Sequence, residues 1–539
     1  MTRLLLLCFF LFNSVRFFAQ VNFTESYLPI VVINTNGQTI PDEPKIMAGL
    51  GVIWNGPGQK NRLSDPLNAY NGKVGIERRG ASSQDIFPKV SYGMELRDNA
   101  GENNPVALLG MPKESDWSLI SNYNDKSLIR DALAYNLAGQ VMDYAPRCRF
   151  VEVVLNNDYL GVYLLTERIK RDPDRVNVAK NDPAEDITGG YVLKLDKELG
   201  DSVSGYWTSH VPPLDVSSGQ NIRFLYHYPR TEDLTPAQKQ YIKQWMYDFE
   251  ENLRSPGFTD PSTGYRKYID PATFIDFMWL NEAFKNIDAY RISTFFYKDR
   301  DSKDARLKMG PVWDFNLAFG NCNYCSGENT SGWMWNFNSI CPQDYWVIPF
   351  WWDRLREDTN FLLEAQQRWK NLRAGPLSDQ AAMTAVDSLV AVLDGGPRSR
   401  NFQRWPVLGA WLWPNNFVGN TYQEEVDYLK DWFLERLQWM DTNVTGLYVG
   451  TYNPGAFFPP RVSPNPARGA TRLEFHAPVG VRFSWALYDV SGRVLYRHYT
   501  STQTHNYHAL DIDLPAAPGL YFLQTDLDGK RYVQKIVVE

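Results

Sequence analysis

Apolar and polar positions follow both strand-like and helical spacing along most of the chain. Strand-like apolar runs lie at 28–34, 73–79, 92–97 and 150–155, and residues 152–165 predict a hairpin turning near Asn156-Asn157-Asp158. Helical spacing occurs at 126–142, after a cap signal at Asn124-Asp125, and again at 235–253, 273–287 and 422–440. These segments predict a large α+β core.

The pattern changes after the last predicted helix. Residues 449–462 are rich in Pro, Gly and Phe, which is typical of a linker. From Ser463 to the end, short alternating runs are separated by turn residues, which predicts a small β-sandwich of about seven strands. We therefore expect a core at 20–448, a linker at 449–462 and a C-terminal β-sandwich at 463–539.

The N-terminus has the pattern of a secretion signal. Arg3 precedes an apolar run at 4–12, and small residues near Ala19 suit cleavage, which predicts a signal peptide at 1–19. Because the run is short and interrupted by Arg16, an uncleaved anchor is the weaker alternative. The signal pattern leads us to expect an exported protein, and no later segment has the pattern of a transmembrane span.

Export to an oxidising compartment changes how the cysteines are interpreted. Cleavage removes Cys8 and leaves Cys148, Cys322, Cys325 and Cys341. Disulfides are then expected, and a local bridge such as Cys325–Cys341 is favoured, although the spacing alone does not choose among three pairings. Zinc at Cys322-x-x-Cys325 is an alternative, but no histidine lies near and Cys148 would have to serve as a ligand.

Charge and length exclude some classes of function. The formal net charge of -7 and the absence of a long basic run argue against nucleic acid or an anionic membrane surface as the main partner. A chain of 539 residues with 44% hydrophobic residues can form two to four folded domains.

One acid stands inside an apolar segment and requires an explanation. In KMGPVWDFNLAFGN, residues 308–321, Asp314 is flanked by Trp313 and Phe315. An isolated buried carboxylate costs several kcal/mol, so a cation or donors should accompany it. The structural alternatives are that Asp314 caps a helix beginning near Leu317 or belongs to a buried ion pair.

A predicted hairpin brings a second acid to the same place. If strands at 292–298 and 307–313 pair around Ser302, then Asp288 and Asp314 emerge at one end of the hairpin. Two carboxylates at such a short distance repel each other unless one is protonated or a cation lies between them. Such oxygen ligands suit Mg²⁺ or Mn²⁺. A glycoside hydrolase using the same two carboxylates is a less favoured alternative.

The C-terminal segment resembles the sorting domain of the Bacteroidetes type IX secretion system. Four motifs carry the resemblance, namely Ser463-Pro464-Asn465-Pro466, Asp489-x-Ser491-Gly492-Arg493, Gly519-Leu520-Tyr521-Phe522 and Lys535-Ile536-Val537-Val538. The resemblance implies interaction with the type IX machinery, passage through the periplasm and outer membrane, and release or anchoring at the cell surface. An ordinary carbohydrate-binding or adhesion sandwich is the alternative.

The segment from about 28 to 440 resembles the CotH (spore coat protein H) kinase family of exported proteins with an atypical protein-kinase-like fold. The motifs that carry the resemblance occur in family order. They are Gly80-Ala81-Ser82-Ser83, Phe87-Pro88-Lys89-x-Ser91-Tyr92, Leu109-Gly110-Met111-Pro112, Asp116-Trp117, Asp125-Lys126-Ser127-x-x-Arg130, Asn157-x-x-x-Gly161-Val162-Tyr163-x-x-x-Glu167, Gly189-Gly190-Tyr191, Asn286-x-Asp288 and Trp313-Asp314-Phe315-Asn316 with Phe319-Gly320.

The resemblance implies an ATP-dependent protein kinase that uses Mg²⁺ or Mn²⁺. Asp288 would accept the proton of the attacking hydroxyl of a secreted or surface protein, and Asp314 would hold the metal ion with Asn316. Lys89 would contact the nucleotide phosphates, and Glu167 would orient that lysine or help to bind the metal or adenine. The small residues that would bend over the phosphates are Gly80, Ser82 and Ser83.

Two departures from the kinase pattern favour an alternative. Ser293 stands where an Asn five residues after the catalytic Asp would hold a second metal ion, and Asn316 replaces a frequent second acid. Both bind hard cations more weakly than a carboxylate does. A catalytically inactive, pseudokinase-like surface binding or structural protein therefore remains open. The aromatic cluster at Trp333, Trp335, Trp346, Trp351 and Trp352 could stack on sugars, but core packing is the favoured interpretation.

Overall fold

A computed structural model describes residues 20–198, 205–216, 219–444, 446, 460–463, 465–476, 482–501, 507–527 and 530–539. The chain divides into two compact units, residues 1–440 and 441–539. The expected signal peptide and nearly all of the expected linker lie outside the described residues. Mixed helices and sheets in the first unit confirm the α+β class.

The first unit begins with a closed β-barrel. Its strand order is β2-β3-β5-β6-β7-β9-β8, and the register follows the predicted alternation, with Val74, Ile76, Met94 and Leu96 all facing the barrel core. The hairpin at 152–165 is confirmed, because Asn156 and Asn157 both adopt positive φ between β8 and β9. The barrel strands are β2 (Ile30–Asn34), β3 (Ile46–Ile53), β5 (Tyr70–Arg79), β6 (Ser91–Arg97), β7 (Asp116–Ile120), β8 (Cys148–Leu155) and β9 (Asp158–Glu167).

A second sheet follows the barrel in sequence. Its order is β11-β12-β10-β13-β14, from the short edge strand to the hairpin that was predicted around Ser302. Helix α3 packs against it, with Tyr241 stacked on Tyr191 of β10 at 6.3 Å between ring centroids. Its strands are β10 (Tyr191–Leu195), β11 (Tyr206–Thr208), β12 (Arg223–Tyr228), β13 (Thr294–Lys298) and β14 (Leu307–Met309), while β1 (Glu25–Ser26) and β4 (Asn61–Arg62) form a separate pair.

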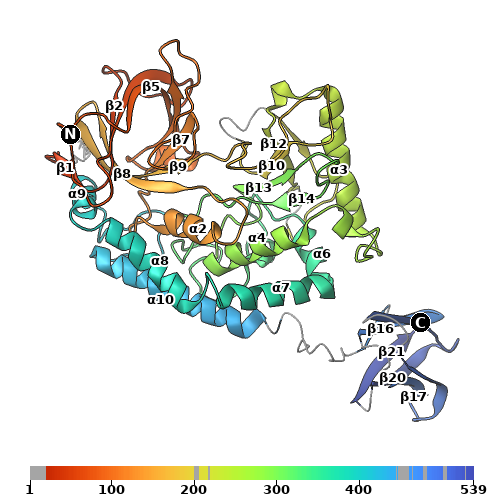
Figure 1. Ribbon diagram of the computed structural model, residues 1–539. Helices are drawn as coiled ribbons and strands as arrows, with labels where there is room; N and C mark the ends of the chain where they lie inside the picture. Colours follow the sequence, from red (N-terminus) through yellow and green to blue (C-terminus); the bar gives the residue numbers. More distant parts are fainter. Residues whose placement is uncertain are drawn as a thin grey trace, which may run out of the picture. The chain divides into compact units, whose positions relative to one another are not determined.

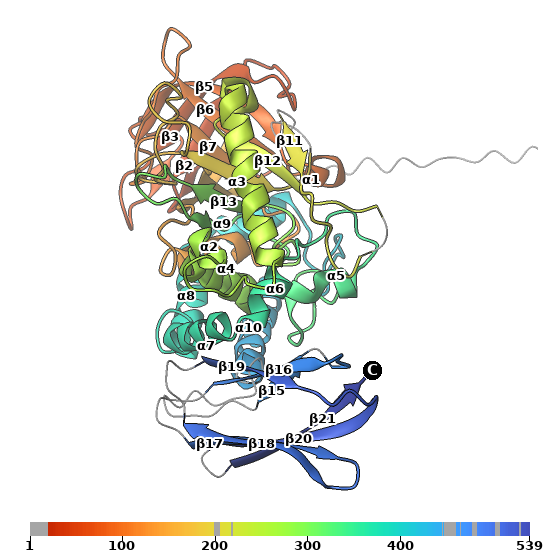
Figure 2. The ribbon, with the colours of Figure 1, turned by 90° about the vertical axis from the view of Figure 1, so that its right-hand side faces the viewer.

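Helices form the rest of the unit. In Figure 1 the barrel and the five-stranded sheet lie above a layer that includes α2, α4, α7, α8 and α10, and Figure 2 shows the same layering from the side. The helices are α1 (Ser82–Ile86), α2 (Arg130–Ala138), α3 (Pro236–Arg254), α4 (Pro271–Phe284), α5 (Phe337–Ile340), α6 (Trp351–Glu357), α7 (Thr359–Arg373), α8 (Asp379–Val392), α9 (Pro397–Arg404) and α10 (Tyr422–Val444).

Helix α2 is shorter than the sequence predicts. The expected helix at 126–142 begins only at Arg130, because Leu128 has φ of 65° and cannot belong to an α-helix. The Asp125 carboxylate still caps the helix, since it accepts the N–H of Arg130 at 2.8 Å. The residue that directly precedes the helix is Ile129, which makes no side-chain cap hydrogen bond, so Asp125 acts on the helix from a preceding loop.

The second unit contains the predicted seven strands among its described residues. They form a three-stranded sheet β15-β16-β19 and a four-stranded sheet β18-β17-β20-β21, which share one apolar core. The strands are β15 (Arg461–Ser463), β16 (Ala470–His476), β17 (Arg482–Asp489), β18 (Val494–Ser501), β19 (Tyr507–Asp513), β20 (Gly519–Leu527) and β21 (Lys530–Val538).

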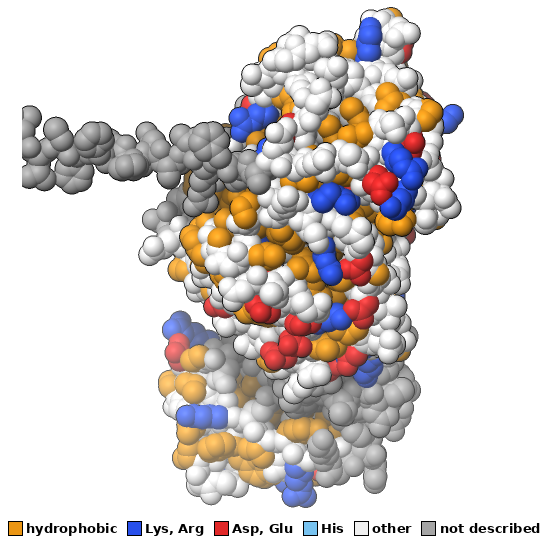
Figure 3. All heavy atoms as spheres, turned by 90° about the vertical axis from the view of Figure 1, so that its left-hand side faces the viewer, with side chains coloured by type: hydrophobic (Ala, Val, Ile, Leu, Met, Phe, Trp, Pro, Cys, Tyr) orange, Lys and Arg blue, Asp and Glu red, His pale blue; other side chains and the backbone are white. Residues whose placement is uncertain are grey.

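On the face shown in Figure 3, basic and acidic side chains of the first unit are interspersed.

Candidate functional site

The β13–β14 hairpin has the predicted register. Phe296 pairs with Met309, so the pairing is centred between residues 302 and 303 as expected. Asn286, two residues before Asp288, donates its Nδ2 atom to the Asp314 carbonyl at 3.3 Å, so the segments that carry the two acids meet at the open end of the hairpin. After burial, the charge of Asp288 is the next cause that raises the pKa of Asp314. The predicted register of the hairpin is confirmed, and it brings the segments of Asp288 and Asp314 to the same end.

Asp314 occupies a constrained backbone position. Its φ is 65°, in the left-handed region that costs a non-glycine residue on the order of 1–3 kcal/mol. Two contacts hold it there: its N–H donates to Tyr135 Oη at 3.2 Å, and its carbonyl accepts from Asn286 Nδ2 at 3.3 Å. The Asn286-x-Asp288 motif thus fixes Asp314 as well as carrying Asp288.

A third carboxylate, Asp131, joins the cluster from helix α2. The side chain is buried, and its Oδ1 atom accepts the N–H of Phe315 at 2.7 Å. Sequence analysis missed Asp131, because an acid in the first turn of a helix is ordinarily explained by the helix dipole. Its only sequence signal is its position directly after the Asp125-Lys126-Ser127-x-x-Arg130 motif.

Burial and mutual repulsion raise the pKa values of these acids. Desolvation first, and then the charge of Asp314, raise the pKa of Asp131 to about 8. Desolvation and the charge of Asp288 raise the pKa of Asp314 to about 6, against the opposing effect of Lys197. The protein therefore gathers carboxylates whose charges its own groups do not fully offset.

This cluster predicts an unusual pH dependence of stability in metal-free buffer. Because the folded pKa of Asp131 lies above its unfolded value, the native state binds more protons between pH 4 and 8, at about 1.4 kcal/mol per unit of pKa difference. The free energy of unfolding should fall as pH rises through this window. The substitution Asp131→Asn should flatten the decline and make the variant more stable than wild type at pH 8, as measured by urea unfolding. A variant with the wild-type slope would contradict the assignment.

Two cations and a fourth acid act on the charge of Asp314. Lys197 and Arg79 lower its pKa, whereas Asp196 raises it, so all three lie within electrostatic reach. The Arg79 guanidinium also lies 5.1 Å from the centre of the Trp313 ring. Sequence analysis missed these residues, since β5 and the segment after β10 reach the hairpin only through the tertiary fold.

Asp196 contacts Ser293, the residue that stands where the kinase pattern has an Asn for a second metal ion. Ser293 donates its backbone N–H to Asp196 Oδ1 at 3.4 Å. Asp196 also forms an ion pair with Lys194 at 3.0 Å. A carboxylate from the residue that follows β10 is therefore close to the place where the kinase pattern would have an amide.

The Lys89 side chain, which the resemblance assigns to the nucleotide phosphates, bonds to neutral groups of β9 and α9. It is buried, and its Nζ atom donates to the Val162 carbonyl at 2.5 Å and to Asn401 Oδ1 at 2.9 Å, with the Tyr163 ring 4.7 Å away. Desolvation lowers its pKa well below the usual value. These neutral partners place Lys89 between β9 and α9.

Glu167 does not orient Lys89 either. It is fully buried, and its carboxylate accepts two hydrogen bonds from the Arg147 guanidinium at 2.9 and 2.8 Å. Arg175 Nε lies 3.5 Å from the same carboxylate. The expectation of a Lys89–Glu167 pair is corrected, because two arginines already occupy Glu167.

The loop at Gly80, Ser82 and Ser83 follows directly after Arg79. Gly80 has φ of 112°, a conformation that favours glycine, and helix α1 begins two residues later at Ser82. An added Cβ at Gly80 would lie 2.2 Å from Ser83 Oγ, so the turn is tight. The predicted phosphate loop thus follows Arg79, whose guanidinium lies over the ring of Trp313, the neighbour of Asp314.

Asn316 is held by an amide network. Its side-chain Nδ2 atom donates to Asn124 Oδ1 at 3.0 Å, and its backbone carbonyl accepts from Asn321 Nδ2 at 2.7 Å. With the amide nitrogen used in this way, Oδ1 is the Asn316 side-chain atom suited to a cation.

The donor set fits a cation that is shared with a substrate. The described residues contain no group of three or more His, Cys, Asp or Glu side chains arranged to hold a metal ion. Mg²⁺ is commonly bound through one or two carboxylates, with phosphate oxygens and water completing its shell. Asp314, with Asp131 nearby and the Asn316 amide, suits such a shared site better than a closed protein cage.

The cysteines and tryptophans have structural roles. Cys325 and Cys341 form the favoured disulfide, while Cys148 and Cys322 are free thiols, so Cys325 is not a zinc ligand. Trp335, Trp351 and Trp352 are buried in the core, which agrees with the packing interpretation.

Comparisons with known proteins give two family matches. The family described as CotH kinase protein matches residues 76–440, and the family described as secretion system C-terminal sorting domain matches residues 461–539. A search of curated proteins finds no match. The tail match indicates type IX export, so the protein is secreted or held at the cell surface. Among the described helices, none has the length and apolarity needed to cross a membrane.

Proposed function

The chain belongs to the CotH kinase protein family, and on that premise we propose that it binds ATP with Mg²⁺ or Mn²⁺ and transfers the γ-phosphate to a hydroxyl of a secreted or surface protein. The observation that carries the proposal is the acid cluster. Asp131 accepts the N–H of Phe315 next to Asp314, and Asn286 links the segment of Asp288 to the Asp314 carbonyl. Burial first, and then the charges of neighbouring acids, raise the pKa values of Asp131 and Asp314. A divalent cation would offset this repulsion.

The cluster residues have different roles in this proposal. Asp314 and Asn316 hold the cation, and Asp131 adds negative charge behind them. The bound cation supplies neutralisation of the phosphate oxygens. Asp288, held by Arg291 at 2.9 Å, orients the acceptor hydroxyl and takes its proton.

Arg79 and Lys197 are better placed than Lys89 to contact the phosphates. Both act on the charge of Asp314, whereas the hydrogen bonds of Lys89 go to neutral groups. We therefore move the phosphate-binding role from Lys89 to these two cations. Gly80, Ser82 and Ser83 keep their proposed role, because they follow Arg79 in a tight turn.

The proposal extends to the fold of the core. In a kinase-like arrangement, the β-barrel with its Arg79 loop would form the nucleotide lobe. The hairpin and the helices around α4 would form the lobe that carries Asp288 and Asp314. Loops at the junction of two rigid lobes are suited to positioning a phosphoryl group between a nucleotide and an acceptor.

A catalytically inactive surface protein is the second candidate. Ser293 at the second-metal position and the neutral surroundings of Lys89 favour it. Such a protein would use the same scaffold to bind a surface partner and would be indifferent to changes in the acid cluster.

Calorimetric titration of Mg-ATP into the full mature chain, meaning residues 20–539, separates the two candidates. We expect saturable binding by the wild type and at least a ~10-fold loss of affinity, about 1.4 kcal/mol, in Asp314→Asn. Lys89→Met should bind with nearly wild-type affinity if it folds, and Asp353→Asn, which lies in a separate ion pair with Arg356, is the matched control. Absence of binding to well-folded wild type with either metal would overturn the proposal in favour of the second candidate.

A further inference from the structure

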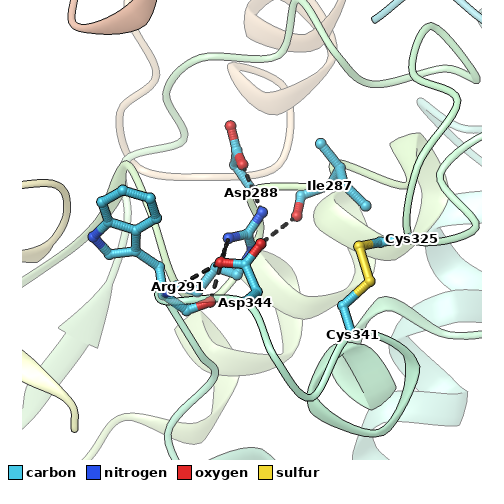
Figure 4. The surroundings of a disulfide bond; sticks show 7 residues. Ile287, Asp288, Arg291, Cys325, Cys341 and Asp344 are labelled. Carbon is cyan, nitrogen blue, oxygen red and sulfur yellow. Dashed lines mark hydrogen bonds and ion pairs between the residues drawn. A yellow bond between two sulfur atoms is a disulfide. The ribbon is translucent and has the colours of Figure 1, made fainter. Parts of the chain in front are cut away.

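Arg291 connects Asp288 to a segment closed by the disulfide. Its Nη2 atom lies 2.9 Å from Asp288 Oδ1, and its Nη1 atom lies 3.2 Å from Asp344 Oδ1. Figure 4 shows the Arg291 guanidinium between the two carboxylates, with the Cys325–Cys341 bond beside them. The side chain is almost completely buried, so these contacts limit the orientations that it can adopt.

Residues 337–346 surround this guanidinium on several sides. The Phe337 ring lies 4.0 Å from its central carbon, and the Trp346 carbonyl accepts from Nη1 at 3.3 Å. The Asp344 carboxylate also accepts the N–H of Trp346 at 2.9 Å, which fixes the acid within its own turn. The position of Arg291 therefore depends on how this segment is held.

The disulfide holds the middle of that segment. Cys341 donates its N–H to the Phe337 carbonyl at 2.7 Å, and its own carbonyl accepts the N–H of Asp344 at 3.0 Å. The bond to Cys325 closes a separation of 16 residues. Because short backbone hydrogen bonds link Cys341 to both Phe337 and Asp344, restraint at Cys341 is passed to the groups that contact Arg291.

We propose that the Cys325–Cys341 disulfide fixes Asp288 through Asp344 and Arg291, so that the site reaches its working geometry in the oxidised chain. Arg291 and Asp344 are positioning residues, which hold a side chain that acts on the substrate. The inference rests on the proposed function and adds a condition to it: the disulfide must be formed for the kinase site to be active. An exported chain would acquire this bond in an oxidising compartment, after leaving the cytoplasm.

Other contacts could hold the segment without the bond. Gln220 donates to the Pro342 carbonyl at 3.0 Å, and Asn338 exchanges hydrogen bonds with the Ile348 backbone at 2.9 and 2.8 Å. If these contacts were sufficient, removal of the disulfide would leave the surroundings of Arg291 unchanged. The test must therefore measure order at Asp288 directly.

Hydrogen exchange of the full mature chain, followed by mass spectrometry, provides this measurement whether or not the protein is active. The reporter is the peptide covering residues 286–293, in which the Ile292 N–H bonds to the Asp288 carbonyl at 3.0 Å. We expect exchange at least about threefold faster in Asp344→Asn and in the double variant Cys325→Ser/Cys341→Ser. The control Asp353→Asn should exchange like the wild type.

Each outcome decides a separate part of the inference. Wild-type exchange over 286–293 in both variants, with faster exchange over 337–346 in the cysteine variant, would overturn it. Faster exchange in Asp344→Asn alone would overturn the part assigned to the disulfide. If the cysteine variant does not fold, Asp344→Asn still tests whether Asp344 and Arg291 hold Asp288. In a phosphotransfer assay, both variants should lose turnover with little change in KM for Mg-ATP. An inactive wild type with the expected exchange pattern would refute the proposed function but not this connection.

Discussion

The variant Asp288→Asn should retain Mg-ATP binding and lose phosphotransfer by about 10²–10⁴-fold, the usual contribution of a positioned general base. The amide keeps the size of the carboxylate but cannot accept the proton of the acceptor hydroxyl. Binding should persist, because the cation is assigned to Asp314, and removal of the Asp288 charge relieves repulsion on Asp314. Phosphorylated hydroxyl groups would be counted by mass spectrometry after incubation of the chain with Mg-ATP.

The matched comparison is Asp314→Asn, which should lose binding and transfer together. If Asp288→Asn transferred phosphate at the wild-type rate, Asp288 would not be the base. If it lost binding to the same extent as Asp314→Asn, the separate roles of the two acids would be refuted.

The substitution Glu282→Ala should lower the free energy of unfolding of the core by about 3–5 kcal/mol, as expected when one partner of a buried ion pair is removed. Glu282 and Arg436 are both fully buried and lie 3.2 Å apart. The Glu282 carboxylate also accepts the N–H groups of Met334 at 2.8 Å and Trp335 at 3.0 Å. Removal of the carboxylate leaves a buried guanidinium and two backbone donors without this acceptor.

Urea unfolding followed by tryptophan fluorescence reports on the core, because the β-sandwich contains only Trp485 of the 18 tryptophans. The double variant Glu282→Met/Arg436→Met removes both charges and should recover part of the loss. An equal loss in the single and double variants would show that the uncompensated Arg436 charge is not the cause. A loss below about 1 kcal/mol in Glu282→Ala would contradict the account of this pair.

Local patterns predicted the elements and the hairpin of the site. Apolar alternation and the turn residues around Ser302 were sufficient to place Asp288 and Asp314 together, since an antiparallel hairpin fixes its own register. The seven-stranded tail followed from the same alternation. These features depend on residues close in sequence, where spacing determines geometry.

The remainder of the site depends on contacts between distant segments. Asp131, Asp196 and Arg79 come from separate elements, and no local spacing indicates that they converge on Asp314. Lys89 shows the converse: its position before β6 was identified, but the direction of its side chain is set by Asn401 on helix α9. Motif spacing can identify a residue without determining which side of the barrel it faces.

The most direct test of the acid cluster as a metal–nucleotide site is electron paramagnetic resonance of Mn²⁺ titrated into the full mature chain with a non-hydrolysable ATP analogue. Wild type should remove Mn²⁺ from the free aqueous signal in a saturable manner that requires the analogue, and Asp314→Asn should not. Equal uptake by both proteins, or none by well-folded wild type, would contradict the assignment of Asp314 and with it the proposed kinase site.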